Sequence, residues 1–199
     1  MKRLGLIGGT SYHSTLEYYR EINKKVGDEI GNSQNPEMLL YSINIEVMRR
    51  QDEDEINKTY LKVAQTLEQA GAEALMICAN TPHMAVDYVQ PKIGISFLHI
   101  ADAVAAEAKF KDYRNLLLLG NKPTMTRSFL KNYLTDHHNL QIHIPDENDV
   151  DRSHYFVSKE LTQGKFTDAA KEFYIELISA YEDKLDAVIL GCTELPILL

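Results

Sequence analysis

The chain has 199 residues, of which 44% are hydrophobic and 25% are charged. This composition is typical of a folded globular protein and excludes an intrinsically disordered or a collagen-like chain. Its 21 Lys and Arg against 29 Asp and Glu give a formal net charge of -8, which argues against nucleic acid or an anionic membrane as a partner. No apolar run approaches the roughly 20 residues that cross a bilayer, and the apolar stretch after Arg3 is too short for a secretory signal, so we expect a cytoplasmic protein.

Seven short apolar runs are predicted to be β-strands because of their length and residue types. They are residues 4–7, 38–45, 74–78, 93–97, 115–119, 140–144 and 187–190. Longer amphipathic segments separate them. This alternation is typical of an α/β protein with parallel sheets.

The segments between the strands have helical periodicity. In the first of them we expect an apolar stripe to pack on a sheet, formed by Leu16, Tyr19, Asn23, Val26 and Ile30. Ser14, with Glu17 three residues later, is predicted to be a helix N-cap, and so is Thr81 before Pro82. An alanine-rich helix predicted at residues 100–109 marks the boundary between two α/β lobes, 1–99 and 100–199.

The two cysteines, Cys78 and Cys192, are too few for a disulfide scaffold, so each is either a buried apolar residue or a chemical group. Both lie at the end of a predicted strand. The first strand end continues into Ala79-Asn80-Thr81, and the second contains Gly191-Cys192-Thr193-Glu194. In open parallel sheets, ligands bind beyond the carboxyl ends of the strands, where unpaired N–H groups of helix N-termini gather.

Five motifs in a fixed order carry a resemblance to a known family. They are Leu4-Gly5-Leu6-Ile7-Gly8-Gly9-Thr10, Ala70-Gly71-Ala72-Glu73, Asn80-Thr81-Pro82-His83, Leu98-His99-Ile100-Ala101-Asp102 and Leu190-Gly191-Cys192-Thr193-Glu194-Leu195. Glycines after a strand are common, whereas Asn-Thr-x-His and Gly-Cys-Thr-Glu in this order and separation are rare together. Over nearly its whole length the chain resembles the aspartate/glutamate racemase family.

The resemblance implies two pseudo-symmetric, flavodoxin-like lobes, each with a parallel sheet, and a site in the cleft between them. It also implies a PLP-independent racemase without any cofactor, which acts on a small dicarboxylic amino acid, aspartate or glutamate, and forms a homodimer. In such an enzyme one cysteine thiolate removes the α-proton from one face while the other cysteine delivers a proton to the opposite face. A position near a helix N-terminus is expected to lower the pKa of each cysteine.

The sequence departs from the family pattern at the first cysteine. Aligned on Asn80, Thr81 and His83, the catalytic position holds Ala79, which cannot carry a proton. Cys78 lies one residue earlier, and neighbouring strand residues point to opposite faces, so we expect its thiol to be buried packing. Similar family members have threonine at this position and act on acidic amino acids of L configuration. The departure therefore argues against symmetric racemisation rather than against activity.

Cys192 remains in register with the family motif and is predicted to be the acid/base group. Thr193 is expected either to orient the thiol or bind a carboxylate, or to cap a helix, and Glu194 to contribute mainly its backbone N–H. Asn80 and Thr81 resemble the family's carboxylate-binding pair, although a turn and a helix cap explain them as well.

Four further residues are predicted to contact the substrate. Thr10 follows a glycine turn through which backbone approaches a small ligand closely, and Gln51 is favoured by alignment over the neighbouring arginines. Thr124 is either an N-cap or a carboxylate donor. Lys165 is either a mobile cationic contact or an ordinary surface lysine. The histidines lack the spacing of metal ligands, so no metal is expected.

The end of the chain is a second departure. In the family, Gly-Cys-Thr-Glu-Leu precedes another strand and a closing helix, whereas this sequence ends at Leu199. We therefore expect the second lobe to lack that segment and to expose a sheet edge. Two alternatives to a racemase stay open: a carboxylate-binding pseudoenzyme, and a one-cysteine decarboxylase of a malonate-like acid, which needs only one-sided protonation of a carbanion.

Overall fold

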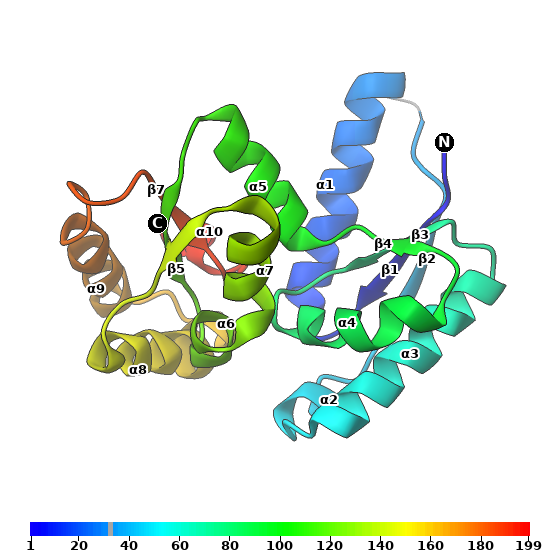
Figure 1. Ribbon diagram of the computed structural model, residues 1–199. Coiled ribbons are helices and arrows are strands. Elements are labelled where there is room, and N and C mark those ends of the chain that lie inside the picture. Colours follow the sequence, from blue (N-terminus) through cyan, green and yellow to red (C-terminus); the bar gives the residue numbers. More distant parts are fainter. Residues whose placement is uncertain (32–33) are drawn as a thin grey trace. The chain divides into compact units, whose positions relative to one another are not determined.

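The computed structural model describes residues 1–31 and 34–199. The chain divides into two compact units, Met1–His99 and Ile100–Leu199, which are called here the first and the second lobe. Each has its own parallel sheet with helices packed on it (Figure 1). The predicted α/β class with two parallel sheets is confirmed.

The sheet of the first lobe has the strand order β2-β1-β3-β4, and every neighbouring pair is parallel. The strands are β1 (Leu4–Gly8), β2 (Met38–Ser42), β3 (Ala74–Ile77) and β4 (Ser96–Phe97). The two long helices are α1 (Tyr12–Ile30) and α3 (Glu53–Gln69), and the short ones are α2 (Glu46–Arg49), η1 (Thr81–Ala85), α4 (Val86–Val89) and η2 (Gln90–Lys92). Asp52 caps α3 by accepting a hydrogen bond from Glu55 N at 3.0 Å, and one face of α3 enters the core with Ile56, Tyr60 and Val63.

Helix α1 does not pack as its periodicity predicts. Leu16, Tyr19 and Ile30 of the expected stripe are 59%, 48% and 42% exposed, whereas Ser14 and Thr15 are buried. Small side chains allow a close approach to β1, because a Cβ on Gly8 would lie 2.4 Å from Thr15 Cγ2. The helix also starts earlier than expected, since its N-cap is Ser11, not Ser14.

The second lobe has a sheet of order β6-β5-β7, again parallel. Its strands are β5 (Asn115–Leu119), β6 (Gln141–His143) and β7 (Ala187–Leu190). Its helices are α5 (Ile100–Phe110), α6 (Lys122–Thr126), α7 (Ser128–His138), α8 (Glu147–Tyr155), α9 (Asp168–Ser179) and α10 (Leu195–Leu198), with the short turns η3 (Phe156–Glu160) and η4 (Leu161–Gln163) after α8.

Strand β5 shows why helices cover both faces of this sheet. Leu116 and Leu118 belong to one buried cluster, which includes residues of α5 and α7. Leu117 and Leu119 belong to another, which includes residues of α9 and α10. This alternation is the two-residue period of a strand buried on both faces.

Several predicted strand ends shift. The second strand ends at Ser42, and the fourth is shortened to Ser96–Phe97, since residues 93–95 form a bend after η2. The sixth is shortened to Gln141–His143. Strands β5 and β7 agree with the prediction.

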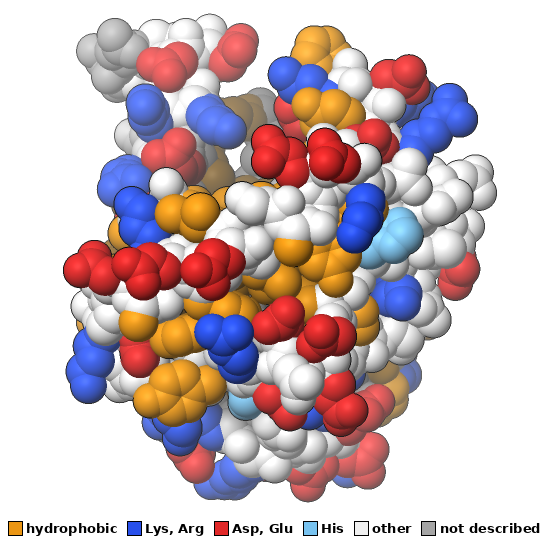
Figure 2. All heavy atoms as spheres, turned by 90° about the vertical axis from the view of Figure 1, so that its left-hand side faces the viewer, with side chains coloured by type: hydrophobic (Ala, Val, Ile, Leu, Met, Phe, Trp, Pro, Cys, Tyr) orange, Lys and Arg blue, Asp and Glu red, His pale blue; other side chains and the backbone are white. Residues whose placement is uncertain are grey.

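The surface mixes charged and apolar groups. Figure 2 shows one face on which hydrophobic side chains are exposed among acidic and basic ones. On the second lobe a groove of about 470 Å³ lies beside α9 and β7, with Ile178, Val188 and Leu199 in its wall. Over the described residues, no helix is long and apolar enough to span a bilayer.

Candidate functional site

The first candidate corner lies where β1 and β3 end side by side. Ile7 is paired with Ile77, and Cys78 N donates to Ile7 O at 2.9 Å, so the turn after β1 and the residues after β3 lie at one edge of the sheet. Gly9 has φ +91°, and a Cβ there would lie 2.1 Å from Ile43 O, so the turn requires glycine. Gly9 N donates to Thr15 Oγ1 at 2.9 Å, which ties the turn to α1.

Ala79, Asn80 and Thr81 are half-buried at the end of β3. Asn80 occupies the N-cap position of η1 without a side-chain capping bond, and Thr81 is the first residue of η1. The expectation that Thr81 caps a helix is therefore wrong, since the helical turn already includes it. Ala79 brings only a methyl group to this corner.

Cys78 is buried as predicted, with 1% of its surface exposed. Burial raises the pKa of its thiol to about 12. Its carbonyl accepts from Ser14 Oγ at 2.7 Å, which fixes the strand end against α1. At neutral pH this cysteine is a neutral thiol.

Thr10 and Gln51 are differently placed. Thr10 is half-buried, and its Oγ1 lies 3.4 Å from the hydroxyl of the buried Tyr60, so it belongs to the wall of the first corner. Gln51 is exposed in the link between α2 and α3 and has a positive φ of 54°. Among the described residues, no hydrogen bond joins the Gln51 side chain to Thr10.

The second candidate corner repeats this arrangement at the ends of β5 and β7. Leu119 is paired with Leu190, and Gly191 N donates to Leu119 O at 2.7 Å. A Cβ on Gly191 would lie 2.6 Å from the same carbonyl, and one on Gly120 would lie 3.2 Å from Gly191 O. The two glycines thus bring the turn after β5 and the residues after β7 into close contact.

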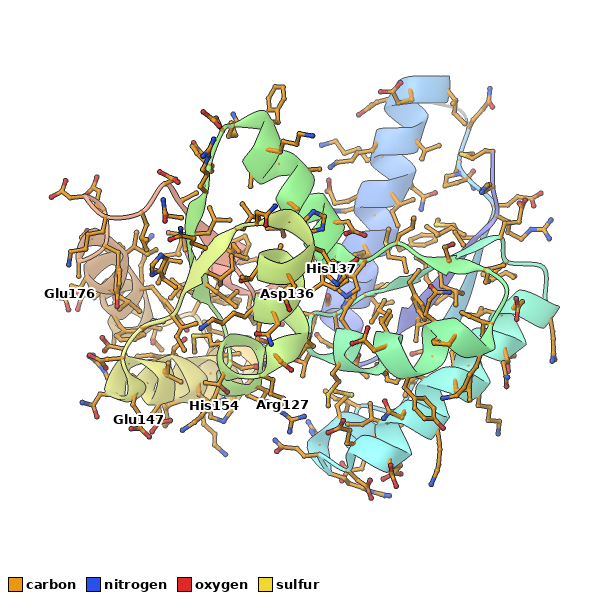
Figure 3. All side chains as sticks on the ribbon, viewed as in Figure 1. Arg127, Asp136, His137, Glu147, His154 and Glu176 are labelled. Atoms are coloured by element: carbon orange, nitrogen blue, oxygen red, sulfur yellow. The ribbon has the colours of Figure 1, made fainter. Side chains whose placement is uncertain are left out.

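Thr124 is fully buried within α6, but it is not the N-cap. That role belongs to Asn121, whose side chain accepts from Thr124 N at 2.9 Å. The turn is also held from α8, where Ser153 Oγ donates to Gly120 O at 2.8 Å and lies 2.8 Å from the hydroxyl of Tyr174. Figure 3 shows His154 on α8, whose Nδ1 accepts from Lys122 N at 3.3 Å at the start of α6.

Cys192 follows Gly191 and is 9% exposed. Its thiol donates to Glu194 Oε2 at 2.8 Å, and Thr193 Oγ1 donates to the same oxygen at 2.9 Å. Glu194 is 6% exposed. Two donors therefore converge on one buried carboxylate oxygen, and the side chain of Glu194, from which only a backbone contact was expected, is the centre of the group.

The predicted lowering of the Cys192 pKa is wrong. Burial, followed by the charge and hydrogen bond of Glu194, raises the pKa of this thiol well above its ordinary range, and the backbone N–H of Glu194 opposes this only in part. Helix α10, which follows, has only four residues. Cys192 is therefore a protonated thiol beside a hydrogen-bond acceptor.

Residues 7–199 match the family model described as Asp/Glu/Hydantoin racemase. The chain belongs to this family.

Solved structures agree with the family assignment. A candidate Asp/Glu racemase from Yersinia pestis is 33% identical, with a TM-score of 0.93 over 100% of this chain and 89% of that chain. An aspartate racemase homologue from Pyrococcus horikoshii is 35% identical, with a TM-score of 0.85 over 100% and 88%. An aspartate racemase from Picrophilus torridus, at 21% identity and a TM-score of 0.71 over 100% and 84%, supports the fold alone.

Lys165 is exposed, and in sequence it is distant from the residues of both corners. It follows Gly164, whose φ is +73°, and its backbone N–H donates to Glu160 O at 3.1 Å. In the described part of the chain, its side chain makes no hydrogen bond or ion pair. Residues 1–31 and 34–199 contain no cluster of three His, Cys, Asp or Glu that could hold a metal ion.

Sequence reasoning missed several groups of the two corners. Asn121 could have been found, because asparagine three residues before a buried Thr124 is an N-cap pattern. His83 was visible within the Asn-Thr-x-His motif. Ser153 and Tyr174 had no signal, because their contacts with the turn after β5 depend on how α8 and α9 pack.

Proposed function

We propose that this chain catalyses proton transfer at the α-carbon of aspartate or glutamate without PLP or another cofactor, with Cys192 as the acid/base group. Membership in the racemase family supports the reaction class. The assignment to Cys192 rests on one observation: its Sγ lies 2.8 Å from the carboxylate of the buried Glu194.

The thiol and the carboxylate work as a pair in this proposal. Glu194 Oε2 accepts the thiol proton, and the thiolate then removes the α-proton of the substrate, whose electron pair passes into the α-carboxylate. The thiol formed returns a proton to the α-carbon, and Glu194 returns its own proton to the pool shared with sulfur and solvent. Thr193 holds the carboxylate oxygen in place through its hydroxyl.

The remaining residues are assigned to the substrate's carboxylates. In the first corner we assign this role to the half-buried Asn80 and Thr81, with Thr10 beside them and the methyl of Ala79 as a wall. In the second corner the assignment falls on Thr193 and on the side chain of Thr124, in the first turn after the N-cap Asn121. Gln51 and Lys165 are exposed and can contribute only if their segments move toward the ligand.

Ala79 makes the proposed chemistry one-sided. At the end of β3 the methyl of Ala79 cannot move a proton, and Cys78 is buried with a raised pKa. We therefore expect exchange of the α-proton of one enantiomer to be faster than its conversion into the other.

We further propose that the protein forms a homodimer. Light scattering after gel filtration tests this.

Because Ala79 supplies no second acid/base group, a single protonated thiol also suits decarboxylation. Loss of carbon dioxide from a malonate-like acid leaves a carbanion that needs one proton from one side. The raised pKa of the Cys192 thiol supports this second candidate. Release of carbon dioxide from methylmalonate or phenylmalonate, absent in the Cys192→Ala variant, distinguishes it from the racemase chemistry.

Deuterium incorporation tests the main proposal. L-Asp, D-Asp, L-Glu and D-Glu are incubated with the protein in deuterated water, and α-deuteration is followed by NMR. We expect incorporation into at least one of them, lost in Cys192→Ala. Binding without incorporation in all four, measured by calorimetry, would instead indicate a carboxylate-binding pseudoenzyme.

A further inference from the structure

A buried histidine lies directly behind the first corner. His83, in η1, is 3% exposed. Its Nδ1 lies 2.9 Å from Ala79 O and 3.1 Å from Asn80 O. Because a carbonyl oxygen only accepts hydrogen bonds, Nδ1 must carry the proton, and this fixes the tautomer of the ring.

The ring is also held in its neutral state. His99 packs against it edge-on, with 4.7 Å between the ring centroids, and is itself buried. Burial and the neighbouring His99 lower the pKa of His83 to about 4. At neutral pH, His83 is therefore an uncharged donor and cannot supply the proton that Ala79 lacks.

The two accepting carbonyls determine where the next N–H groups point. The Asn80 carbonyl also accepts from the backbone N–H of His83 at 3.0 Å. In a trans peptide the C=O of one residue and the N–H of the next point in opposite directions, and the structure has no cis peptide among its described residues. Holding the carbonyls of Ala79 and Asn80 toward His83 thus directs the N–H groups of Asn80 and Thr81 away from it.

We infer that His83 is a positioning residue that orients the backbone N–H groups of Asn80 and Thr81 toward a carboxylate of the substrate. The role of the carboxylate rests on the proposed function, whereas the orientation of the backbone does not. The inference gives a use to the one histidine of the Asn-Thr-x-His motif, whose ring faces the carbonyl side of the corner.

Two substitutions separate donation from packing. In His83→Asn the side-chain N–H stands at the position of Nδ1 and can still donate. In His83→Leu the volume is similar but the donor is lost. His143→Asn is the matched control, because His143 is an exposed histidine on β6 of the other lobe.

The inference predicts a selective effect on substrate affinity. His83→Leu is expected to raise the KM for the exchanged substrate, and the dissociation constant of L-Asp or L-Glu, about tenfold, the effect of losing one or two oriented hydrogen bonds. Its kcat should change less than about threefold, and His83→Asn and His143→Asn should keep a wild-type KM. An unchanged KM in His83→Leu, or equal damage in His83→Asn, would overturn it.

An independent readout needs no substrate. In protein labelled with ¹⁵N-histidine, NMR should show His83 as a neutral ring protonated at Nδ1 at pH 7. Amide hydrogen exchange at Asn80 and Thr81 should be faster in His83→Leu than in His83→Asn. A ring protonated at Nε2, or unchanged amide exchange, would contradict the positioning role, even if the wild type exchanges substrate protons. The protein could give the expected spectra and yet neither bind nor exchange any of the four amino acids. That result would refute the proposed function and the carboxylate target, but not the positioning role of His83.

Discussion

The two strand-end corners are built alike but equipped differently. Each has a glycine turn beside a strand end, and each has a cysteine. At the end of β3, Cys78 is one residue too early, is 1% exposed and leaves Ala79 at the corner. At the end of β7, Cys192 comes after Gly191 and meets Glu194. A shift of one residue at a strand end therefore separates a fully buried thiol from a thiol that donates to a carboxylate.

The two corners also differ in the charge states of their titratable groups. Burial raises the pKa of Cys78 to about 12, and burial with His99 lowers that of His83 to about 4, so both are neutral at pH 7. In the first corner, His83 lies within hydrogen-bond distance of two backbone carbonyls. The second offers a thiol and a carboxylate in direct contact. This contrast suggests a division of labour between binding and proton transfer.

The largest effect is expected from removing each sulfur in turn. Cys192→Ala should lower the rate of α-proton exchange about 10²–10⁴-fold, the usual contribution of a positioned acid/base group. Cys78→Ala, which removes the packing sulfur, should retain a rate within about threefold of wild type while losing some thermal stability. The rate of deuterium incorporation is measured for both variants. Equal losses of rate would contradict the different roles of the two cysteines.

The first corner lacks an acid/base group at Ala79, and a substitution can add a thiol there. Ala79→Cys should raise the rate of conversion between enantiomers about 10²-fold, because the second face of the α-carbon gains an acid/base group. Ala79→Ser is the control of matched size, since its hydroxyl does not titrate near neutral pH. Chiral chromatography of the products measures the conversion. A similar rise in both variants would mean that size rather than acidity limits the reaction.

Acid should weaken the first lobe through His83. Its pKa is about 4 in the folded protein against an ordinary 6.5, so between these values the unfolded state binds more protons and stability falls as the pH falls. From pH 7 to pH 5 this histidine should cost about 2 kcal/mol of unfolding free energy. His83→Asn should lack this part of the loss in urea unfolding. An identical pH dependence in wild type and variant would show that His83 titrates normally.

The smallest predicted effect concerns the charge of Glu194. Burial and, after it, the charge of Glu194 raise the pKa of Cys192. Glu194→Gln removes the charge, so more thiolate forms, and alkylation of Cys192 by iodoacetamide at pH 8 should become about tenfold faster. The same variant should exchange substrate protons more slowly, because the amide cannot accept the thiol proton. Glu147→Gln, on the exposed start of α8, is the control. Slower alkylation would contradict the account of the pair.

The bounds of a strand were predictable where a short apolar run fits only a β-strand. The runs at β5, the buried central strand, and at β7, a half-buried edge strand of the same parallel sheet, agree with the structure to the residue. Helix α1 was mispredicted because periodicity shows that a stripe exists but not that it meets the sheet, and its small residues Ser14 and Thr15 approach β1 instead. Helix starts at Ser11 and Asn121 were missed because several cap residues compete within a few positions.

The candidate site was predictable in position more than in chemistry. Motif register predicted that Cys192 and Asn80 follow strand ends, and the structure places both there, since this depends only on order along the chain. The charge state of Cys192 was not predictable, because the side chain of Glu194 turns back onto the thiol, and sequence does not reveal the direction of that side chain. The fixed tautomer of His83 likewise depends on carbonyl directions that sequence does not reveal.

The most direct test follows exchange and inversion in one sample. Each enantiomer of aspartate and glutamate is incubated in deuterated water, and α-deuteration is measured together with the enantiomer ratio. If a single sulfur moves the proton, deuterium should enter one enantiomer at least about tenfold faster than that enantiomer is inverted. Inversion at the same rate as deuterium entry, or exchange that survives in Cys192→Ala, would contradict this account.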